Sequence, residues 1–237
     1  MKITDQIKQE ALAHAKKDSP RESVGLVHIV KGREKYFPCN NLAETPDEHF
    51  VLDPNDYVKC EEKGQITAVI HSHPITNHHP SPADLVACEK SGLPWFVVNP
   101  HTELWGYCEP KGYELPYVGR PFYHGIIDCY SLVKDYFKRE FKIELKEYHR
   151  RDEWWNKGEN LYLENFKKEG FYEIPMDEIR YGDCFLMKIQ SETCNHAAIY
   201  LGENIVLHHV QGRLSSRDVY GGYYQKVTEL CLRHESR

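Results

Sequence analysis

Two histidines and one aspartate in a short stretch of the chain have the side chains and the spacing to bind a metal ion. The apolar run 66–70 predicts a strand that ends at His71, and alternate residues of a strand point the same way, so His71 and His73 can converge on one ion. Asp84 follows in the first turn of a helix predicted to begin at Ser81. Two imidazoles and a carboxylate leave one position of a tetrahedral zinc ion open to water, as in catalytic sites.

A carboxylate elsewhere in the sequence could serve this site as a base. Glu22 lies just before the apolar run 24–30, which also predicts a strand, and it could take a proton from the water. The opposing interpretation is an exposed loop whose histidines bind nothing. We interpret His78 and His79 in that way, as loop residues or as alternative ligands. The same donor types would also accept iron or manganese.

The order of these residues resembles the JAMM (MPN-plus) metalloprotease family over residues 1–108. The shared pattern consists of Glu22, His71-Ser72-His73-Pro74 and Ser81-x-x-Asp84. The resemblance implies an α/β fold of the cytidine-deaminase type with zinc on His71, His73 and Asp84. It also implies that Glu22 polarises the water and that Ser81 steadies the water or the oxyanion. Members of this family cleave amide bonds, and nothing in the spacing identifies the amide.

A cysteine in the second half of the chain stands where a helix should begin. Asp128 is a good N-cap, and the helix dipole favours the thiolate of Cys129. His196 precedes an apolar run and could act as the base, with His208 fixing its tautomer and His209 competing for that third position. The opposing interpretation is a packing role, because a cysteine at a helix start more often packs than reacts.

Three short motifs in the second half resemble the NlpC-type cysteine peptidases. They are DCYSLV at 128–133, GDCFL at 182–186 and HAAIYLG at 196–202. The resemblance spans 117–233 and implies a papain-like α+β fold that acts on the peptide stems of bacterial cell walls. It implies that Cys129 is the nucleophile, His196 the base and His208 the third member. Tyr117 lies where this family often carries a tyrosine near the oxyanion.

The 237 residues are enough for two domains, and a stretch rich in proline and glycine at 109–116 predicts the linker between them. The first domain, 1–108, has the helices and strands of an α/β protein. The second, 117–237, has a predicted helix at 129–139 and a β-rich end, which is typical of α+β proteins. We assign no role to the aromatic and charged segment 148–172.

Composition and charge disfavour several classes of partner. A net charge of −6 without a basic stripe argues against nucleic acid. No apolar segment is long enough to cross a membrane, and the N-terminus lacks the apolar core of a secretory signal, so we expect synthesis in the cytoplasm. The eight cysteines have no paired spacing, which indicates mostly buried thiols in a reducing compartment.

A JAMM domain fused to an NlpC-type domain resembles the family of tail tip assembly proteins of lambda-like phages and prophages. Further shared segments are PRESVGL at 20–26, HGIIDCYSLV at 124–133 and LHHVQGRLS at 207–215. The resemblance implies phage tail tip proteins and bacterial peptidoglycan as partners. It also implies a location in the host cytoplasm during tail assembly, with the virion tail tip as a second location.

Two hypotheses of different classes follow. In the first, the chain is a peptidase of tail assembly: the cysteine domain hydrolyses peptide bonds of peptidoglycan during cell-wall penetration, and the zinc domain cleaves an amide bond in a tail protein or in the wall. In the second, the chain is a structural tail-assembly factor with one or both sites inactive. A host wall-remodelling enzyme or a deubiquitinase-like protease is a minor alternative, disfavoured by the missing signal and by the second domain respectively.

Overall fold

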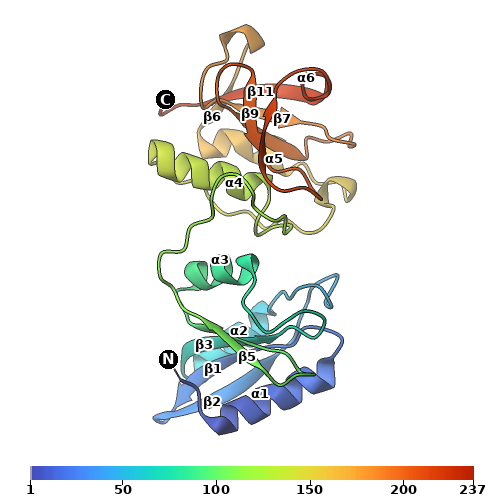
Figure 1. Ribbon diagram of the computed structural model, residues 1–237. Helices are drawn as coiled ribbons and strands as arrows, with labels where there is room; N and C mark the ends of the chain where they lie inside the picture. Colours follow the sequence, from blue (N-terminus) through green and yellow to red (C-terminus); the bar gives the residue numbers. More distant parts are fainter. Residues whose placement is uncertain (1) are drawn as a thin grey trace. The chain divides into compact units, whose positions relative to one another are not determined.

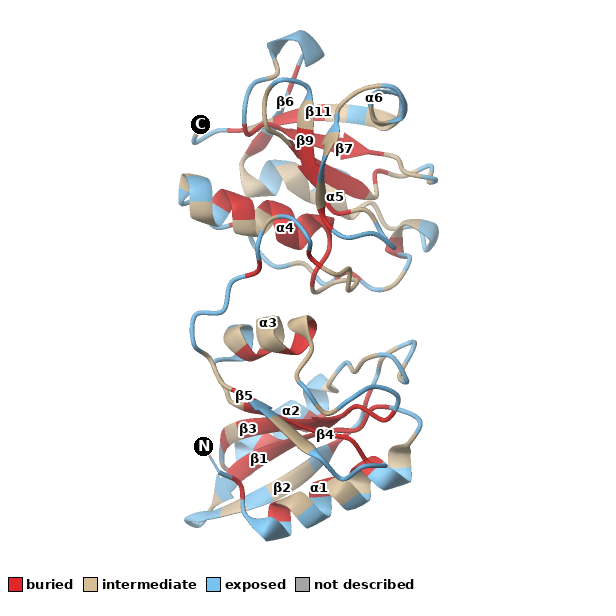
Figure 2. Cartoon of the chain, viewed as in Figure 1, coloured by how far each residue is buried: buried red, intermediate tan, exposed pale blue. Residues whose placement is uncertain are grey.

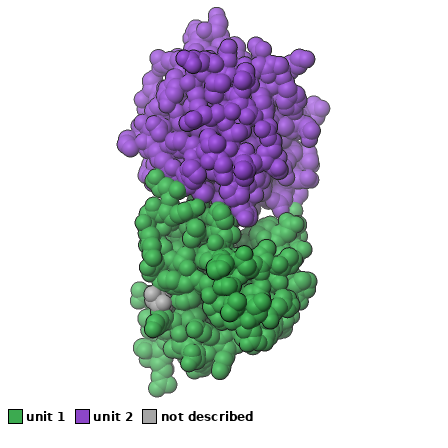
Figure 3. Space-filling model, in the orientation of Figure 1, with its two compact units in different colours: residues 1–114 green, residues 115–237 purple. Residues whose placement is uncertain are grey.

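The computed structural model describes residues 2–237, which divide into two compact units (Figure 3). The first unit ends at Glu114 and the second runs from Leu115 to Arg237. The division falls inside the segment 109–116, which is rich in proline and glycine. Each unit has its own β-sheet with helices packed against it (Figure 1).

The first unit is a five-stranded sheet with helices on both faces. Its helices are α1 (Asp5–Asp18), α2 (Pro54–Lys63) and α3 (Pro82–Ser91). Its strands are β1 (Val24–Val30), β2 (Arg33–Cys39), β3 (Gln65–Ser72), β4 (Trp95–Val98) and β5 (Trp105–Cys108). The strand order is β2-β1-β3-β4-β5, in which β3 and β4 are parallel and the other neighbours antiparallel.

Alternate side chains of the strands build two cores in this unit. On one face, Ile7 of α1 belongs to the same cluster as Ile70 of β3. On the other face, Val69 of β3 clusters with Cys60 of α2. Successive residues of a strand point to opposite faces, so His71 shares the face of Val69. The buried residues lie along the strands and on the inner sides of the helices (Figure 2).

The main elements predicted for the first half are confirmed, with two omissions. The run 24–30 is β1, and β3 continues beyond residue 70, so that His71 lies within the strand. Strand β2 is not predicted, because its residues are mostly exposed or half-buried and form no continuous apolar run. Helix α2, in which only Asp56 and Cys60 are buried, is not predicted either.

The second unit is a six-stranded antiparallel sheet with helix α4 packed on it. Its strands are β6 (Phe171–Ile174), β7 (Cys184–Met187), β8 (His196–Tyr200), β9 (Ile205–His208), β10 (Ser216–Val219) and β11 (Thr228–His234). Its helices are α4 (Cys129–Tyr136), α5 (Leu161–Asn165) and α6 (Tyr223–Val227), and a π-helical turn, Phe137–Phe141, continues α4. The strand order is β10-β9-β8-β7-β11-β6.

Helix α4 covers one face of this sheet. Leu132 and Phe137 pack in the same cluster as Leu186 of β7. On the opposite face, Phe185 stacks on Tyr220 with ring centroids 4.2 Å apart. This arrangement of one helix and an antiparallel sheet is the α+β architecture predicted from the order of the elements.

The aromatic segment 148–172 is part of the folded core of the second unit. Trp154, in a short 3₁₀ turn, is only 2% exposed and packs edge-on against Tyr162 of α5. Tyr162 in turn reaches Cys129 at the start of α4. Among residues 2–237, no helix has the length and apolar character needed to span a membrane.

Two candidate active sites

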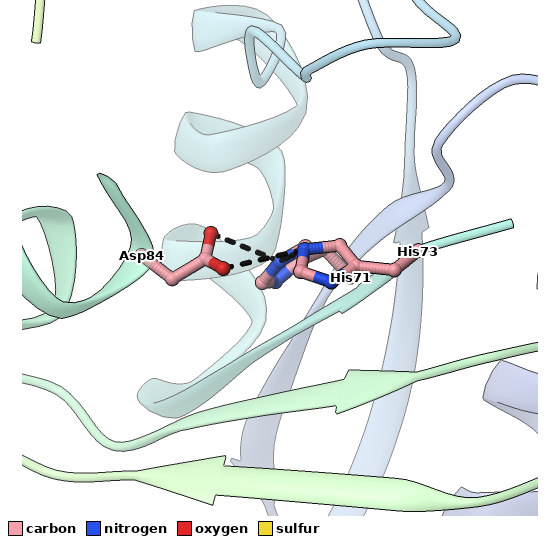
Figure 4. Close-up of side chains that lie close together, drawn as sticks. All are labelled: His71, His73 and Asp84. Atoms are coloured by element: carbon pink, nitrogen blue, oxygen red, sulfur yellow. Dashed lines mark hydrogen bonds and ion pairs between the residues drawn. The ribbon is translucent and has the colours of Figure 1, made fainter. Parts of the chain in front are cut away.

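His71, His73 and Asp84 come together in the first unit (Figure 4). The Nε2 atoms of the two histidines are 3.1 Å apart. One oxygen of Asp84 lies 3.1 Å from Nε2 of His71, and the other lies 3.2 Å from Nε2 of His73. All three side chains are buried, with His71 at 0% exposure. The end of β3 and the start of α3 therefore converge on one point from which water is largely excluded.

The outer nitrogen of His73 is engaged by the loop that follows it. Nδ1 of His73 is 2.9 Å from the carbonyl oxygen of Asn77, which can only accept, so Nδ1 carries the proton and Nε2 keeps its lone pair. Asn99 holds this loop by donating from Nδ2 to the carbonyls of His73, at 2.9 Å, and Thr76, at 2.7 Å. The ring of His73 is thus oriented toward the other two side chains.

The donor set fits a zinc ion. Ligand atoms about 2.0–2.1 Å from a tetrahedral ion are about 3.3 Å apart, and the separations among His71, His73 and Asp84 are 3.1–3.2 Å. The buried Nδ1 of His71 has no hydrogen-bond partner, and Phe50 and Trp95 lie against the ring at centroid distances of 4.9 and 5.4 Å. Two imidazole nitrogens and a carboxylate lie close together with too few protons to hydrogen-bond one another. A bound cation would interact favourably with all three.

Glu22 lies beside this group because two strands are tied together next to it. Ser23 donates from its backbone N–H to Oγ of Ser72 at 2.8 Å, which links the entry to β1 with the end of β3. Asn41 donates from Nδ2 to the carbonyl of Glu22 at 2.9 Å. Burial raises the pKa of Glu22 to about 7, against the pull of the neighbouring His71 and His73 charges. A carboxyl group with such a pKa can exchange protons near neutral pH.

Ser81 and Asp84 form the capping box of α3. Oγ of Ser81 accepts from the backbone N–H of Asp84 at 3.1 Å, and the Ser81 N–H donates to Oδ2 of Asp84 at 2.7 Å. Burial alone would raise the pKa of Asp84, but His71 and His73 hold it well below its usual value. The hydroxyl of Ser81 still has its own proton to donate. The cap therefore aims the Asp84 carboxylate at the histidines.

The other two histidines of this stretch lie outside the group. His78 and His79 stack on each other with ring centroids 4.2 Å apart. The carbonyl of His78 lies so close to Gly106 of β5 that a Cβ there would approach it to 2.0 Å. These residues therefore shape the loop, while the three converging donors come from His71, His73 and Asp84.

Cys129 is the first residue of α4 in the second unit. Asp128 caps this helix by accepting from the Ser131 N–H at 2.9 Å. Arg150 donates to the same carboxylate from Nε at 2.8 Å, and both side chains of this ion pair are buried. Burial alone would raise the pKa of Asp128, but Arg150 outweighs it and keeps the carboxyl ionised. A cap and a buried ion pair thus fix the helix start that carries the cysteine.

The expectation of a lowered thiol pKa is wrong for this structure. The side chain of Cys129 is 7% exposed, and burial, followed by the charge of Asp128, raises its pKa to about 11. Hydrogen bonds from the hydroxyl of Tyr162, 3.1 Å from Sγ, and from the backbone of Ala197 lower the pKa of Cys129, but by less than burial raises it. Loss of hydration therefore outweighs the helix dipole, and the resting cysteine is a neutral thiol.

His196 and His208 lie next to each other on neighbouring strands. Nε2 of His196 is 3.2 Å from Nδ1 of His208. Burial, with the neighbouring His208 and His209, holds the pKa of His196 well below its ordinary value. His209 is not the partner of His196; its ring packs edge-on against Phe122. Of the two adjacent histidines, the structure thus places His208 beside the candidate base.

Cys129 and His196 open onto one cavity of about 270 Å³. Its wall is largely aromatic and polar and includes Phe122, Trp155, Asn195 and Gln211. A space of this size, with a thiol and an imidazole in its wall, can accept a few residues of a peptide. Segments far apart in the sequence contribute to it, since the helix start, the strand β8 and the segment 148–172 all reach the cavity.

Tyr117 does not lie where the sequence analysis expects it. Its hydroxyl donates to Glu140 at 2.9 Å, and its ring packs against Tyr136 with centroids 5.1 Å apart. It is not among the residues that line the cavity. The aromatic hydroxyl next to the thiol comes instead from Tyr162, in the segment to which we assigned no role. Only the aromatic density of that segment hinted at such a contact.

The comparisons with known proteins agree with this two-part architecture. Residues 4–106 match the family model of prokaryotic homologs of the JAB domain, and residues 119–233 match the NlpC/P60 family. The protein therefore combines a JAB-type domain with an NlpC/P60 domain, as the sequence motifs predict. Over 82 residues, which are 32% of this chain and 55% of the relative, it is 32% identical to the probable TtuB-protein conjugate cleaving protease of Thermus thermophilus.

Two relatives extend over most of the chain. The tail tip assembly protein K of Escherichia phage N15 is 41% identical over 94% of this chain and 92% of its own. The protein of the same name from Escherichia phage lambda is 37% identical over 78% of this chain and 90% of its own. The chain belongs to the family of tail tip assembly protein K, which confirms the resemblance found in the sequence.

Proposed function

We propose that the chain is a peptidase of phage tail assembly whose second unit hydrolyses peptide bonds of bacterial peptidoglycan during cell-wall penetration. The observation that carries this proposal is the cavity of about 270 Å³ onto which Cys129 and His196 open, with His208 behind His196. We further propose that phage tail tip proteins are its partners. The host cytoplasm during assembly and the virion tail tip are the places where it acts.

In the proposed reaction, His196 takes the proton of the Cys129 thiol and the thiolate attacks the carbonyl carbon of a peptide bond. The Cys129 Sγ–C bond forms, and the negative charge passes to the carbonyl oxygen. His196 then gives its proton to the leaving amine as the C–N bond breaks. Water, activated by His196 in turn, hydrolyses the thioester and restores the thiol.

For the first unit we propose cleavage of an amide bond in a tail protein or in the wall. His71, His73 and Asp84 would hold the zinc ion. When bound, that ion supplies Lewis-acid chemistry, polarising a carbonyl and activating water. Glu22 would accept the proton of the attacking water and pass it to the leaving amine, and Ser81 would donate a hydrogen bond to the developing oxyanion.

The test is a digest of purified peptidoglycan by the full chain, read by mass spectrometry. We expect new stem-peptide fragments with wild type and with Glu22→Gln, and none with Cys129→Ala. Cys194→Ala, which changes another buried cysteine of the same unit, is the matched control and should leave the digest unchanged. Intact muropeptides with wild type, under conditions where a known endopeptidase cuts them, would overturn the wall-cutting role.

A second candidate function is a structural role in tail assembly with inactive sites. The observation that favours it is the closed resting state of the cysteine, 7% exposed and hydrogen-bonded by Tyr162. Phage genomes that encode Cys129→Ala together with Glu22→Gln separate the two functions. A purely structural role predicts normal numbers of infectious particles, whereas a peptidase role predicts a loss of infectivity.

A further inference from the structure

A carboxylate that the sequence analysis does not single out lies at the end of the histidine row in the second unit. Asp218 is on β10, the edge strand next to β9. In the register, Ser216 is directly opposite His208, and Asp218, two residues further, shares its face. His196 is likewise two residues from Ala198, the partner of His208 across β8 and β9. Three neighbouring strands thus present His196, His208 and Asp218 on one face of the sheet.

Asp218 ends a chain of hydrogen bonds. Its Oδ2 lies 3.1 Å from Nε2 of His208, whose Nδ1 lies 3.2 Å from Nε2 of His196. The same oxygen accepts from the hydroxyl of Tyr224 at 3.1 Å, and the guanidinium of Arg213 is 3.4 Å away. Burial works against ionisation, but hydrogen bonds from His208, Ser216 and Tyr224 hold the pKa of Asp218 below its usual value. The carboxylate therefore only accepts hydrogen bonds at neutral pH.

An acceptor at this end determines where the protons of both histidines lie. Nε2 of His208 must carry a proton to donate to Asp218. In a neutral ring, Nδ1 of His208 is then the acceptor, so Nε2 of His196 must donate to it. Nδ1 of His196 is left with the lone pair. The backbone of Ala197, the next residue along β8, hydrogen-bonds the Cys129 sulfur, which brings the thiol to the start of this strand.

We propose that Asp218 is a positioning residue of the cysteine site, which sets the tautomers of both His208 and His196 so that Nδ1 of His196 can take the proton of the Cys129 thiol. This inference rests on the proposed function of Cys129 as a nucleophile. The step moves one proton: the S–H bond breaks, the Nδ1–H bond forms, and the positive charge on His196 lies at the end of a row that terminates in a carboxylate. The ionisable groups around the row are His209, Arg213 and Tyr224.

The substitution Asp218→Asn tests the proposal because it keeps the shape and reverses one hydrogen bond. The amide of the variant can donate to Nε2 of His208, which would shift both tautomers and leave a proton on Nδ1 of His196. A carboxylate that fixes the tautomer of a catalytic histidine contributes on the order of 10⁴ in rate. Glu229→Gln is the matched control, because it removes a carboxylate that pairs with Lys188 on the same sheet and away from this row.

The experiment measures alkylation of Cys129 by iodoacetamide in the full chain across pH 5–10, by mass spectrometry of its peptide. Nitrogen-15 NMR of the histidine rings reports the tautomers. We expect wild type and Glu229→Gln to react at the same slow rate at neutral pH, because only a small fraction of the buried Cys129 is thiolate there. We expect Asp218→Asn to react at least about tenfold more slowly at that pH, with the proton of His196 moved from Nε2 to Nδ1.

The outcomes separate this inference from the proposed function. If Cys129 of the wild type is not alkylated at any pH between 5 and 10, the proposed nucleophile is wrong. If wild type reacts at neutral pH and Asp218→Asn reacts equally fast with unchanged ring tautomers, the role of Asp218 is wrong while the nucleophile stands. A slow variant whose tautomers are unchanged would also overturn the positioning role, because the loss would then have another cause.

Discussion

The two candidate sites solve the same problem, activation of a nucleophile in a buried place, in opposite ways. In the first unit, the ligand atoms of His71, His73 and Asp84 converge on one point, and Nδ1 of His71 has no hydrogen-bond partner. In the second unit, His196 and His208 form a closed row of hydrogen bonds that ends at Asp218. The donor atoms of the first site would need a bound cation to neutralise their mutual repulsion. The side chains of the second site are already joined by hydrogen bonds within the protein.

The two sites also differ in how far apart their residues lie in the sequence. The three converging donors of the first site lie within one strand end and one helix start, so the spacing of a short segment defines them. The second site needs α4, three strands and the segment 148–172. A locally built site depends on a ligand for its stability, whereas a site spread over a sheet depends on the packing of the whole unit.

We expect the largest difference between the two units when the metal is removed, because only the first unit should lose stability. We expect about one zinc per chain and, after chelation, a loss of about 4 kcal/mol for the first unit when free zinc had been about a thousandfold above its dissociation constant. Calorimetry of the full chain should show the transition of residues 115–237 unchanged. His71→Ala should abolish the bound metal and His78→Ala, the control, should keep it. Equal metal content in the two variants would contradict the assignment.

The second prediction concerns the dependence of the cysteine site on packing. Trp154 is 2% exposed, and Trp154→Ala should destabilise the second unit by about 3–5 kcal/mol, since it leaves a large cavity behind Tyr162. Denaturant unfolding measures this loss. Trp155→Ala is the control, because the neighbouring ring is only partly buried and should cost clearly less. Similar losses in both variants would show that the segment is not a core element.

The third prediction concerns the contribution of His209 to the loss of stability in acid. Burial lowers the pKa of His209 from 6.5 to about 4. Between these values the unfolded chain binds a proton that the folded chain does not, so the stabilisation is complete above pH 6.5 and is lost as the pH falls toward 4. We expect a loss of about 2 kcal/mol over this window. His209→Gln should weaken the pH dependence of the unfolding free energy, and His149→Gln, at an exposed histidine, should not.

The smallest effect should appear in the segment 109–116, near the end of the first unit. Glu89 of α3 accepts backbone hydrogen bonds from Lys111 at 2.6 Å, from Gly112 at 3.2 Å and from Tyr113 at 2.9 Å. Glu89→Ala should free this segment and raise the rate of tryptic cleavage after Lys111 several-fold, by roughly a factor of three to ten. Lys90→Ala is a neighbouring control. An unchanged cleavage rate would mean that Glu89 does not restrain the segment.

The sequence predicts those parts whose pattern is local. Apolar runs identify the central strands, and Ser81-Pro82 identifies the start of α3. The edge strands β2, β6 and β10 escape prediction because they are short or half exposed and lack a continuous apolar run. The same limit applies to the second site. The contact of Asp218 with His208 depends on the register of β9 and β10, and the lowered thiol pKa expected for Cys129 ignored its burial.

Each candidate site contains an aspartate that also belongs to the capping box of a helix. Asp84 and Asp128 are each part of a capping box, Asp84 as the third helical residue and Asp128 as the N-cap, so each aspartate stabilises the start of its helix. A typical N-cap contributes about 1 kcal/mol. The unfolding free energy of metal-free Asp84→Ala would measure this contribution in the first unit, whereas Asp128→Ala would also break the buried ion pair with Arg150. A lineage that ceased to use either activity would still be selected to retain both aspartates for folding. Inactive descendants are therefore expected to carry much of both motifs.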